Sequence, residues 1–241
     1  MKLEVCIDSL QGAVIAQSSG AYRVELCAGL PEGGTTPSSG LIQKVCQVAE
    51  NLKVYVLIRP RGGDFLYSDD EFEIMQADVR YCGTAGCDGV VMGMLNADGT
   101  VDKNRCRELV KIAKEYGMGV TFHRAFDRSN DLFQALEDVI ETGCERILTS
   151  GGYDNVIEGK EVLRRLIEKA GQRIIIMPGA GVTPANAKEL IQYTGLQELH
   201  GTFRTVYTGN MQYKNPHLSH PEQEYSFWMT DAEKIKKIIH L

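Results

Sequence analysis

Short runs of strand-forming residues recur along this chain, and each is followed by a stretch with the periodicity of a helix. The spacing between runs is roughly 30 residues, the length of one βαβ unit. Alternation of this kind is typical of a parallel sheet that is covered by helices. The predicted strands are Leu3–Asp8, Arg23–Leu26, Lys53–Ile58, Gly89–Val91, Gly119–Phe122, Arg146–Leu148, Arg173–Met177 and Glu198–His200.

A glycine precedes several of these strands at a fixed spacing. Gly20, Gly86, Gly143 and Gly195 each follow a helical stretch, and an apolar strand position comes four residues later. Glycine suits the left-handed conformation in which many helices end, so these positions delimit repeated helix–strand units. Eight units in 241 residues predict an α/β fold, a single (β/α)8 barrel of the TIM type that spans residues 1–241. The alternative, an open doubly wound sheet, usually has fewer strands.

Local patterns predict where helices begin and where the repeat is interrupted. Ser68 and Glu71 have the spacing of a capping box, and Thr183, which proline follows, has that of a helix N-cap. Asp231 precedes the last helical stretch. The segment Gly201–Met229 is long, polar and mixed with Tyr, His and Pro, so we expect an extended loop after the eighth strand.

Charge, hydropathy and cysteine content exclude several classes of protein. Lys and Arg number 26 and Asp and Glu 32, a net charge of −6, which is unlike a nucleic-acid binder. No apolar run approaches the ~18 residues of a membrane span, and Asp8 falls where a signal peptide would be apolar, so we expect a cytoplasmic protein. Seven scattered cysteines without C-x-x-C predict free thiols in a reducing compartment. We predict no organic cofactor.

Polar and apolar side chains alternate along the predicted strands. In the first strand, Glu4, Cys6 and Asp8 share one parity, and the other strands follow the same rule. Because alternate residues of a barrel strand face the interior, and barrel active sites lie at the C-terminal ends of the strands, we expect a polar cluster there. Salt bridges that only close the barrel, such as Glu25–Arg59, are the alternative. The expected members are Cys6, Asp8, Glu25, Cys27, Arg59, Arg61, Asp64, His123, Arg124, Glu198 and His200.

Two kinds of motif predict anion binding. Arg59 and Arg61 flank a proline and precede Gly-Gly. This pattern suggests a rigid fork that binds a carboxylate or phosphate. The alternative is an ordinary turn in which Asp64 bonds to its own backbone. Glycine-rich stretches follow strands six and seven, where barrels often bind phosphate through backbone N–H groups. The candidate anion-binding residues are Arg59, Arg61, Arg124, Ser150, Gly151, Gly179 and Gly181.

The candidate acid–base residues come from the same cluster. His123 begins the stretch His-Arg-Ala-Phe-Asp, in which Asp127 would cap a helix while the histidine either transfers protons or is a satisfied core residue. The candidate catalytic residues are Glu25, Asp64, His123, Glu198 and His200.

Several of these motifs occur in a fixed order along the chain. They are Glu25–Cys27, Glu32–Ser38, Ile58–Ser68, Thr121–Asp127, Leu148–Gly151 and Met177–Val182. With them, the chain resembles the CutC copper-homeostasis family along nearly its whole length. The resemblance implies a (β/α)8 barrel and a cytoplasmic protein that is linked to copper tolerance and binds Cu(I). The ligands proposed in the family are two cysteines, whose positions match Cys6 and Cys27 here. After His200 this chain has Gly-Thr-Phe-Arg, where many members have small residues.

Two functions are compatible with this cluster. Cu(I) prefers thiolate ligands, and neighbouring strands ~4.8 Å apart could bring Cys6 and Cys27 to one ion; two small buried apolar residues are the alternative for this pair. Arginines, glycine-rich loops and histidines are instead what an enzyme needs to act on a small phosphorylated or carboxylated metabolite by acid–base chemistry. We predict copper homeostasis, with this enzyme as the alternative. The expected partner is a copper ion or a small anionic ligand, and neither a nucleic acid nor a membrane. Catalysis and homo-oligomer formation are left open.

Overall fold

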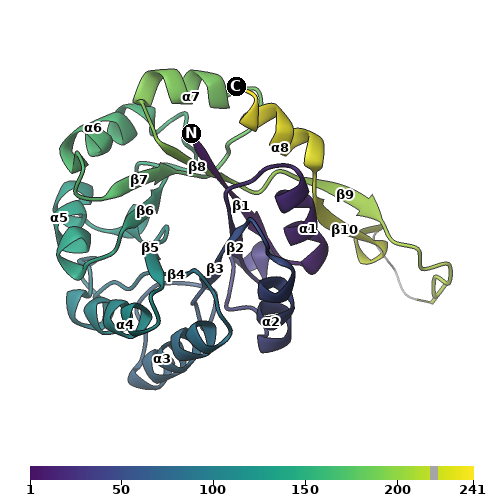
Figure 1. The fold of residues 1–241 in the computed structure, drawn as a ribbon, viewed down its shortest axis with the longest axis horizontal. Helices are drawn as coiled ribbons and strands as arrows, with labels where there is room; N and C mark the ends of the chain where they lie inside the picture. The colour runs from purple at the N-terminus through teal and green to yellow at the C-terminus, as the bar shows by residue number, and fades with distance from the viewer. Residues whose placement is uncertain (218–221) are drawn as a thin grey trace.

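Eight parallel strands form a ring, and helices surround it, in a computed structural model that describes residues 1–217 and 222–241 (Figure 1). The strands lie within two residues of their predicted bounds. They are β1 (Lys2–Ile7), β2 (Arg23–Leu26), β3 (Lys53–Leu57), β4 (Gly89–Met92), β5 (Gly119–Phe122), β6 (Arg146–Thr149), β7 (Ile175–Pro178) and β8 (Glu198–Gly201). The surrounding helices are α1 (Leu10–Ser18), α2 (Ser39–Val48), α3 (Asp69–Thr84), α4 (Lys103–Glu115), α5 (Leu132–Thr142), α6 (Lys160–Ala170), α7 (Ala187–Thr194) and α8 (Ala232–Ile239).

The order of the strands is that of a TIM-type barrel. They are hydrogen-bonded in the order β7-β6-β5-β4-β3-β2-β1-β8, so strands that are consecutive in the sequence are neighbours, and β1 also pairs with β8. β7 and β8 lie beside each other and complete the ring. The predicted α/β barrel is therefore confirmed.

The helix starts follow local sequence chemistry. Ser68 caps α3, because its hydroxyl accepts from the backbone N–H of Glu71 at 3.2 Å while the Glu71 carboxylate accepts from that of Ser68 at 2.8 Å, which confirms the capping box. Asp231 caps α8 as expected. The helix expected directly after Thr183 begins later, at Ala187, because a turn comes first in which the Thr183 carbonyl accepts from the Ala187 N–H.

The segment Gly201–Met229, expected to be an extended loop, instead contains an antiparallel hairpin. Its strands are β9 (Arg204–Thr208) and β10 (Ser226–Thr230), which pair along their whole length and project from the barrel as an arm (Figure 1). A long segment does follow the eighth strand, but the hairpin within it was not predicted, because its two strands are short and pair only with each other.

The interior of the barrel holds a buried network of charges. Arg23 on β2 pairs with Glu4 on β1 and, at 2.5 Å, with Glu198 on β8. Arg146 on β6 also pairs with Glu198, at 2.6 Å. All four side chains are at most 5% exposed, and the two pairs with Glu198 join strands that are not neighbours in the ring. Each charge faces an opposite one, which offsets the cost of removing it from water.

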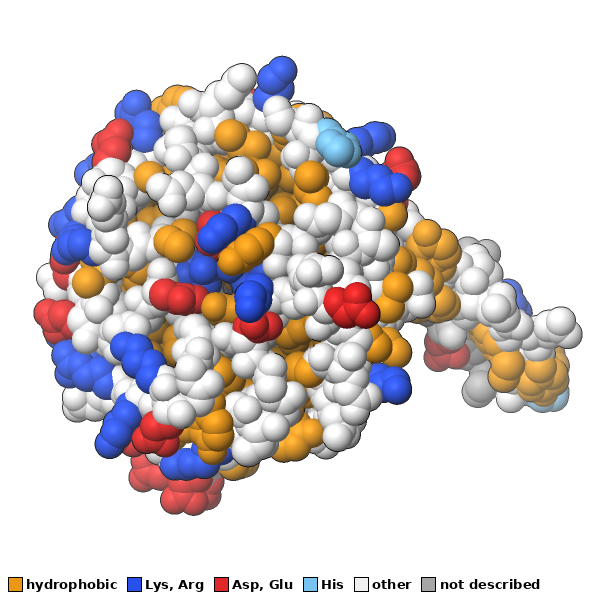
Figure 2. Space-filling model, in the orientation of Figure 1, with side chains coloured by type: hydrophobic (Ala, Val, Ile, Leu, Met, Phe, Trp, Pro, Cys, Tyr) orange, Lys and Arg blue, Asp and Glu red, His pale blue; other side chains and the backbone are white. Residues whose placement is uncertain are grey.

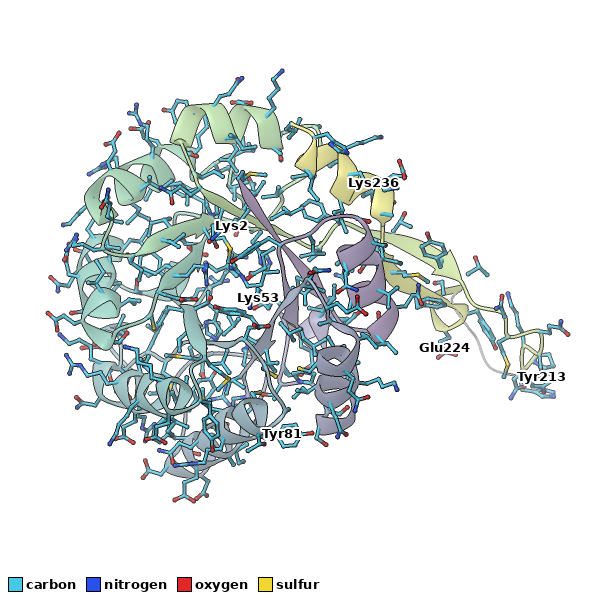
Figure 3. All side chains as sticks on the ribbon, viewed as in Figure 1. Lys2, Lys53, Tyr81, Tyr213, Glu224 and Lys236 are labelled. Carbon is cyan, nitrogen blue, oxygen red and sulfur yellow. The ribbon has the colours of Figure 1, made fainter. Side chains whose placement is uncertain are left out.

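Figures 2 and 3 show the end of the barrel at which the strands begin. Lys2 and Lys53, the first residues of β1 and β3, lie near the middle of the ring in Figure 3, and charged side chains gather there in Figure 2. The strands end at the opposite side of the barrel. None of the helices in the described ranges has the length and apolar character of a membrane span.

Candidate functional site

A pocket of about 430 Å³ lies where the strands end. β1, β2, β5 and β8 contribute residues close to their last positions, and the loops after β2, β3 and β7 complete the wall. Such a position is where TIM barrels bind their ligands. The lining residues are Cys6, Glu25, Cys27, Leu30, Gly33, Leu57, Arg59, Phe65, His123, Arg124, Leu148, Ala180, Gly181, Val182, Thr183, His200, Gly201, Thr202 and Arg204.

Two cysteines meet in the wall of this pocket. The Sγ atoms of Cys6 and Cys27 are 3.7 Å apart, and both residues are buried. Strand register explains the contact. Cys6 lies opposite Glu25 in the β1–β2 ladder, and Cys27 follows two residues later on the same face of its strand. The expectation that the two sulfurs lie close enough to share one metal ion fits this geometry.

His200 joins the thiol pair to the buried charges below it. It lies opposite Glu4 in the β1–β8 ladder, and its Nδ1 is 2.7 Å from a Glu4 carboxylate oxygen. Its Nε2 is 3.7 Å from a carboxylate oxygen of Glu25. Burial alone would lower the pKa of His200, but hydrogen bonds with Cys6 and Glu4 and the nearby carboxylates outweigh it and raise the pKa to about 10. The imidazole is therefore positively charged at neutral pH.

The two thiols differ in their protonation. The hydrogen bond with Cys27, together with the charges of His200 and Arg204, outweighs burial and lowers the pKa of Cys6 to about 6. The same hydrogen bond, with burial, raises the pKa of Cys27 well above its usual value. At neutral pH the pair therefore consists of one thiolate, on Cys6, and one thiol, on Cys27, beside the imidazolium of His200.

Glu25 stands between the two thiols and His200. Burial and the negative charge of Cys6 raise its pKa well above the usual value, which favours the protonated form of the carboxyl group. Two groups of possible metal ligands share this residue: Cys6, Glu25 and Cys27 in one, and Glu4, Glu25 and His200 in the other, each with atoms within 4.8 Å of one another. The sulfur-containing group suits a soft metal ion, since thiolates select such ions.

Arg59 and His123 lie on another part of the pocket wall. Arg59 is 5% exposed, and its guanidinium donates to the backbone carbonyls of Glu32, Gly34 and Gly63 at 3.1, 2.7 and 2.8 Å. It makes no ion pair in the described part of the chain, so the Glu25–Arg59 salt bridge considered above does not form. Burial and the charge of Arg59 lower the pKa of His123 to about 3, so this imidazole is neutral.

Glu198 does not lie in the pocket, although it was expected there. Its carboxylate is 2% exposed and accepts from Arg23 and Arg146 inside the barrel. Burial would raise its pKa, but the two arginines outweigh burial and lower it. As the first residue of β8, it has the same parity as His200 but lies one layer deeper. Its contacts are those of a structural ion pair.

The expected fork of Arg61 and Asp64 also lies outside the pocket lining. The Arg61 guanidinium pairs with Asp64 at 3.0 Å and with Glu71 at 2.6 Å, and Asp64 is 73% exposed. Arg59 alone of the two arginines points into the pocket. The motif is therefore split: one arginine faces the ligand space and the other fastens the loop to the start of α3.

Asp8, Ser150, Gly151 and Gly179 belong to the surroundings of the pocket, not to its lining. Ser150 forms hydrogen bonds with Asp127, which also accepts from the Gly152 N–H. Asp127 thus holds the loop after β6 in place, whereas Asp131 caps α5. Arg124 and Gly181, the other anion-binding candidates, do line the pocket.

Sequence reasoning missed several lining residues. Arg204 reaches the pocket from β9, with one guanidinium nitrogen 3.7 Å from Asp8, and Thr202 lies beside it. Ala180 follows β7 with φ of 93°, a conformation that is rare and costly for a residue other than glycine. The change after His200 from small residues to Gly-Thr-Phe-Arg was the one signal that pointed to Arg204.

Comparison with known proteins gives consistent relatives. A model of the CutC family matches residues 1–205. The copper homeostasis protein cutC homolog of Homo sapiens is 44% identical over 240 residues, which cover 98% of this chain and 87% of that protein. A CutC family protein of Xylella fastidiosa is 45% identical over 239 residues, with 99% and 88% covered.

Solved structures show the same fold. The crystal structure of the CutC protein from Streptococcus agalactiae has a TM-score of 0.79 and 34% identity, and the match covers 84% of this chain and 98% of that one. Phosphoribosylanthranilate isomerase from Thermotoga maritima has a TM-score of 0.59 at 13% identity, with 99% and 96% covered. The second likeness is one of fold alone.

Proposed function

This chain belongs to the CutC family, and on that premise we propose that it serves copper homeostasis by binding Cu(I) between Cys6 and Cys27. The observation that carries the proposal is the distance of 3.7 Å between the two sulfurs in the wall of a pocket. Cu(I) is a soft ion that prefers thiolates over carboxylates and amines. The carboxyl group of Glu25 offers only hard oxygen atoms, so we assign the ligand role to the two sulfurs.

The charges around the thiol pair also support a monovalent cation as its ligand. The Cys6 thiolate is balanced by the imidazolium of His200, and the thiol of Cys27 still holds a proton. When the ion binds, Cys27 loses that proton, so one positive charge enters and one leaves. The total charge of this buried site stays constant, which keeps the cost of desolvation low.

The proposed site requires that both sulfurs remain reduced. Metal binding uses thiolates, and a disulfide between the two cysteines would remove both ligands. All seven cysteines of the chain are free thiols in the structure. We therefore propose that the protein works in a reducing compartment, the cytoplasm.

Anaerobic titration with Cu(I) against a colorimetric chelator tests the proposal. The Cys6→Ser/Cys27→Ser double variant should lose the tightest equivalent of bound metal. The matched control is Cys46→Ser/Cys87→Ser, since those sulfurs are 3.3 Å apart but the pKa values of both thiols are raised. The control should bind Cu(I) like the parent. If the first variant keeps the parent's stoichiometry and affinity, the thiol pair is not the copper site.

A second function, an enzyme that acts on a small anionic metabolite, is favoured by a different observation. Arg59 and His123 line the pocket, and Nε of the first and Nε2 of the second are buried polar atoms without a hydrogen-bond partner among the described residues. Glu25, with its raised pKa, has the protonation of a general acid. Turnover of small carboxylates or phosphates, followed by NMR and abolished by Glu25→Gln, would support this function.

A further inference from the structure

We propose that Arg59 and His123 together bind the carboxylate group of a small organic ligand in the pocket that also holds the thiol pair. Neither residue is one of the proposed copper ligands, so a failure of copper binding would not contradict this carboxylate site. Arg59 supplies its positive charge. Arg59 lines the pocket, and three backbone carbonyls hold its guanidinium in place, but its Nε–H is buried and has no hydrogen-bond partner among the described residues. Burying a cation with an unpaired hydrogen-bond donor costs free energy, and a ligand that accepts from this donor would offset that cost.

His123 supplies a second unused donor. Its Nδ1 accepts from the backbone N–H of Ala125 at 3.1 Å, which leaves the proton of the neutral ring on Nε2. That Nε2 is buried and has no hydrogen-bond partner in the described ranges, and the residue is 5% exposed. A neutral imidazole held in this tautomer can donate to an oxygen atom of a ligand, but it adds no charge of its own.

Phe65 holds the two donors in a common position. The Arg59 guanidinium carbon lies 5.0 Å from the centre of the Phe65 ring, and the imidazole of His123 lies 4.9 Å from it. Both side chains are thus packed against one ring that also lines the pocket. Donors that are fixed before the ligand arrives lose little entropy when it binds.

The balance of charge favours a carboxylate over a phosphate. The other arginines of the lining already have acidic partners: Arg124 pairs with Asp127 at 2.8 Å, and Arg204 lies 3.7 Å from Asp8. Arg59 therefore offers the single uncompensated positive charge among the described lining residues. The one charge and two donors of Arg59 and His123 match a monoanion with two oxygens, whereas a phosphate dianion would bring a second negative charge that this pair does not balance.

The rest of the lining indicates an apolar body for the ligand. Leu30, Leu57, Leu148 and Val182 face the same space of about 430 Å³ as Phe65. Pockets that combine apolar walls with a few fixed polar groups bind small organic molecules and orient them by the polar end. A ligand such as an aromatic or branched aliphatic carboxylate satisfies both parts of the wall.

Benzoate, its uncharged counterpart benzamide, and inorganic phosphate are suitable probes. We expect benzoate to bind the purified protein with a dissociation constant on the order of 1 mM, from two hydrogen bonds of which one is charged. Binding is followed by NMR, with the side-chain 15N resonances of His123 as the local reporter. Benzamide and phosphate should bind at least about tenfold more weakly. Equal binding of benzoate and benzamide, preferred binding of phosphate, or no saturable binding of benzoate would overturn the proposal.

Three variants locate the binding site. Arg59→Met should weaken benzoate binding about tenfold or more, and so should His123→Asn, which keeps the acceptor for Ala125 but removes the Nε2 donor. Arg61→Met is the matched control, because this arginine lies outside the pocket lining, and it should bind benzoate like the parent. His123→Asn covers the case in which Arg59→Met fails to fold. Parent-like affinity in folded His123→Asn, or an equal loss in Arg61→Met, would contradict the assignment.

Discussion

The carboxylate of Glu4 connects the ion network inside the barrel to the thiol pair at its mouth, through the 2.7 Å contact between its Oε1 and Nδ1 of His200. Its other oxygen accepts from Arg23. Burial would raise the pKa of Glu4, but Arg23 and His200 outweigh it and lower the pKa to about 2. Because Glu4 stays ionised, His200 stays protonated, and the imidazolium in turn stabilises the thiolate of Cys6. The deep charges thus tune the chemistry of the pocket without touching a ligand.

This relay predicts the reactivity of Cys6. Its alkylation by iodoacetamide should rise with pH around a midpoint near pH 6, since the thiolate is the nucleophile and its pKa is about 6. The variant His200→Gln removes the positive charge and should move that midpoint to higher pH. Peptide mapping by mass spectrometry gives the rate at each cysteine separately. Cys46, whose pKa is raised, serves as the internal control and should be unchanged by the variant. An unmoved midpoint for Cys6 would show that His200 does not stabilise the thiolate.

Replacement by glutamine should destabilise the protein at Glu198 but not at Glu25. Glu198→Gln removes the partner of two buried arginines and should lower the free energy of unfolding by ~3–5 kcal/mol. Glu25→Gln replaces a carboxyl group whose raised pKa favours its neutral form, so the free energy of unfolding of this variant should stay close to that of the parent. Urea denaturation at pH 7 measures both. Similar losses in the two variants would mean that Glu25 is also part of the structural ion network.

The different positions of Glu25 and Glu198 show what strand parity can predict and what it cannot. Parity states which side of a strand faces the interior, and with the register of parallel neighbours it placed Cys6, Glu25 and Cys27 in one group. It does not state how deep a residue lies. Glu198 and His200 share a parity, but the first belongs to the middle of the barrel and the second to its mouth.

Other parts of the site depend on contacts that no local pattern contains. Arg59 and Arg61 look equivalent in the sequence, but Arg61 pairs with Asp64 in its own loop and with Glu71 on the next helix and lies outside the pocket lining. Arg204 comes from a hairpin strand whose partner lies about twenty residues later, so no short-range periodicity could predict it. The barrel itself was predictable because its repeat of strand, helix and glycine is local.

The projecting arm carries the protein's one tryptophan, which makes the arm observable by fluorescence. Trp228 is 54% exposed on β10, with the guanidinium carbon of Arg204 5.6 Å from its ring. Its emission should have the long wavelength of a water-exposed indole, and acrylamide should quench it readily. Trp228→Phe is the control and should abolish the signal. Short-wavelength emission that acrylamide quenches poorly, and that reverts to long wavelength on dilution, would mean that a second copy of the chain covers this strand.

The neutral state of His123 predicts a specific loss of stability in acid. Its pKa is about 3 in the folded chain, below the ~6.5 expected when unfolded, so between these values only the unfolded state takes up the proton. The stabilising contribution is therefore complete above pH ~6.5 and is lost as the pH falls toward 3. Compared with His123→Asn, the free energy of unfolding of the parent should decrease by about 2 kcal/mol more between pH 7 and pH 5. Urea denaturation at the two pH values measures this difference, and the carboxylates common to both proteins largely cancel from it. Parallel losses in the parent and the variant would show that His123 takes up a proton as readily in the folded chain as in the unfolded one, which would contradict a neutral ring whose Nδ1 accepts from Ala125.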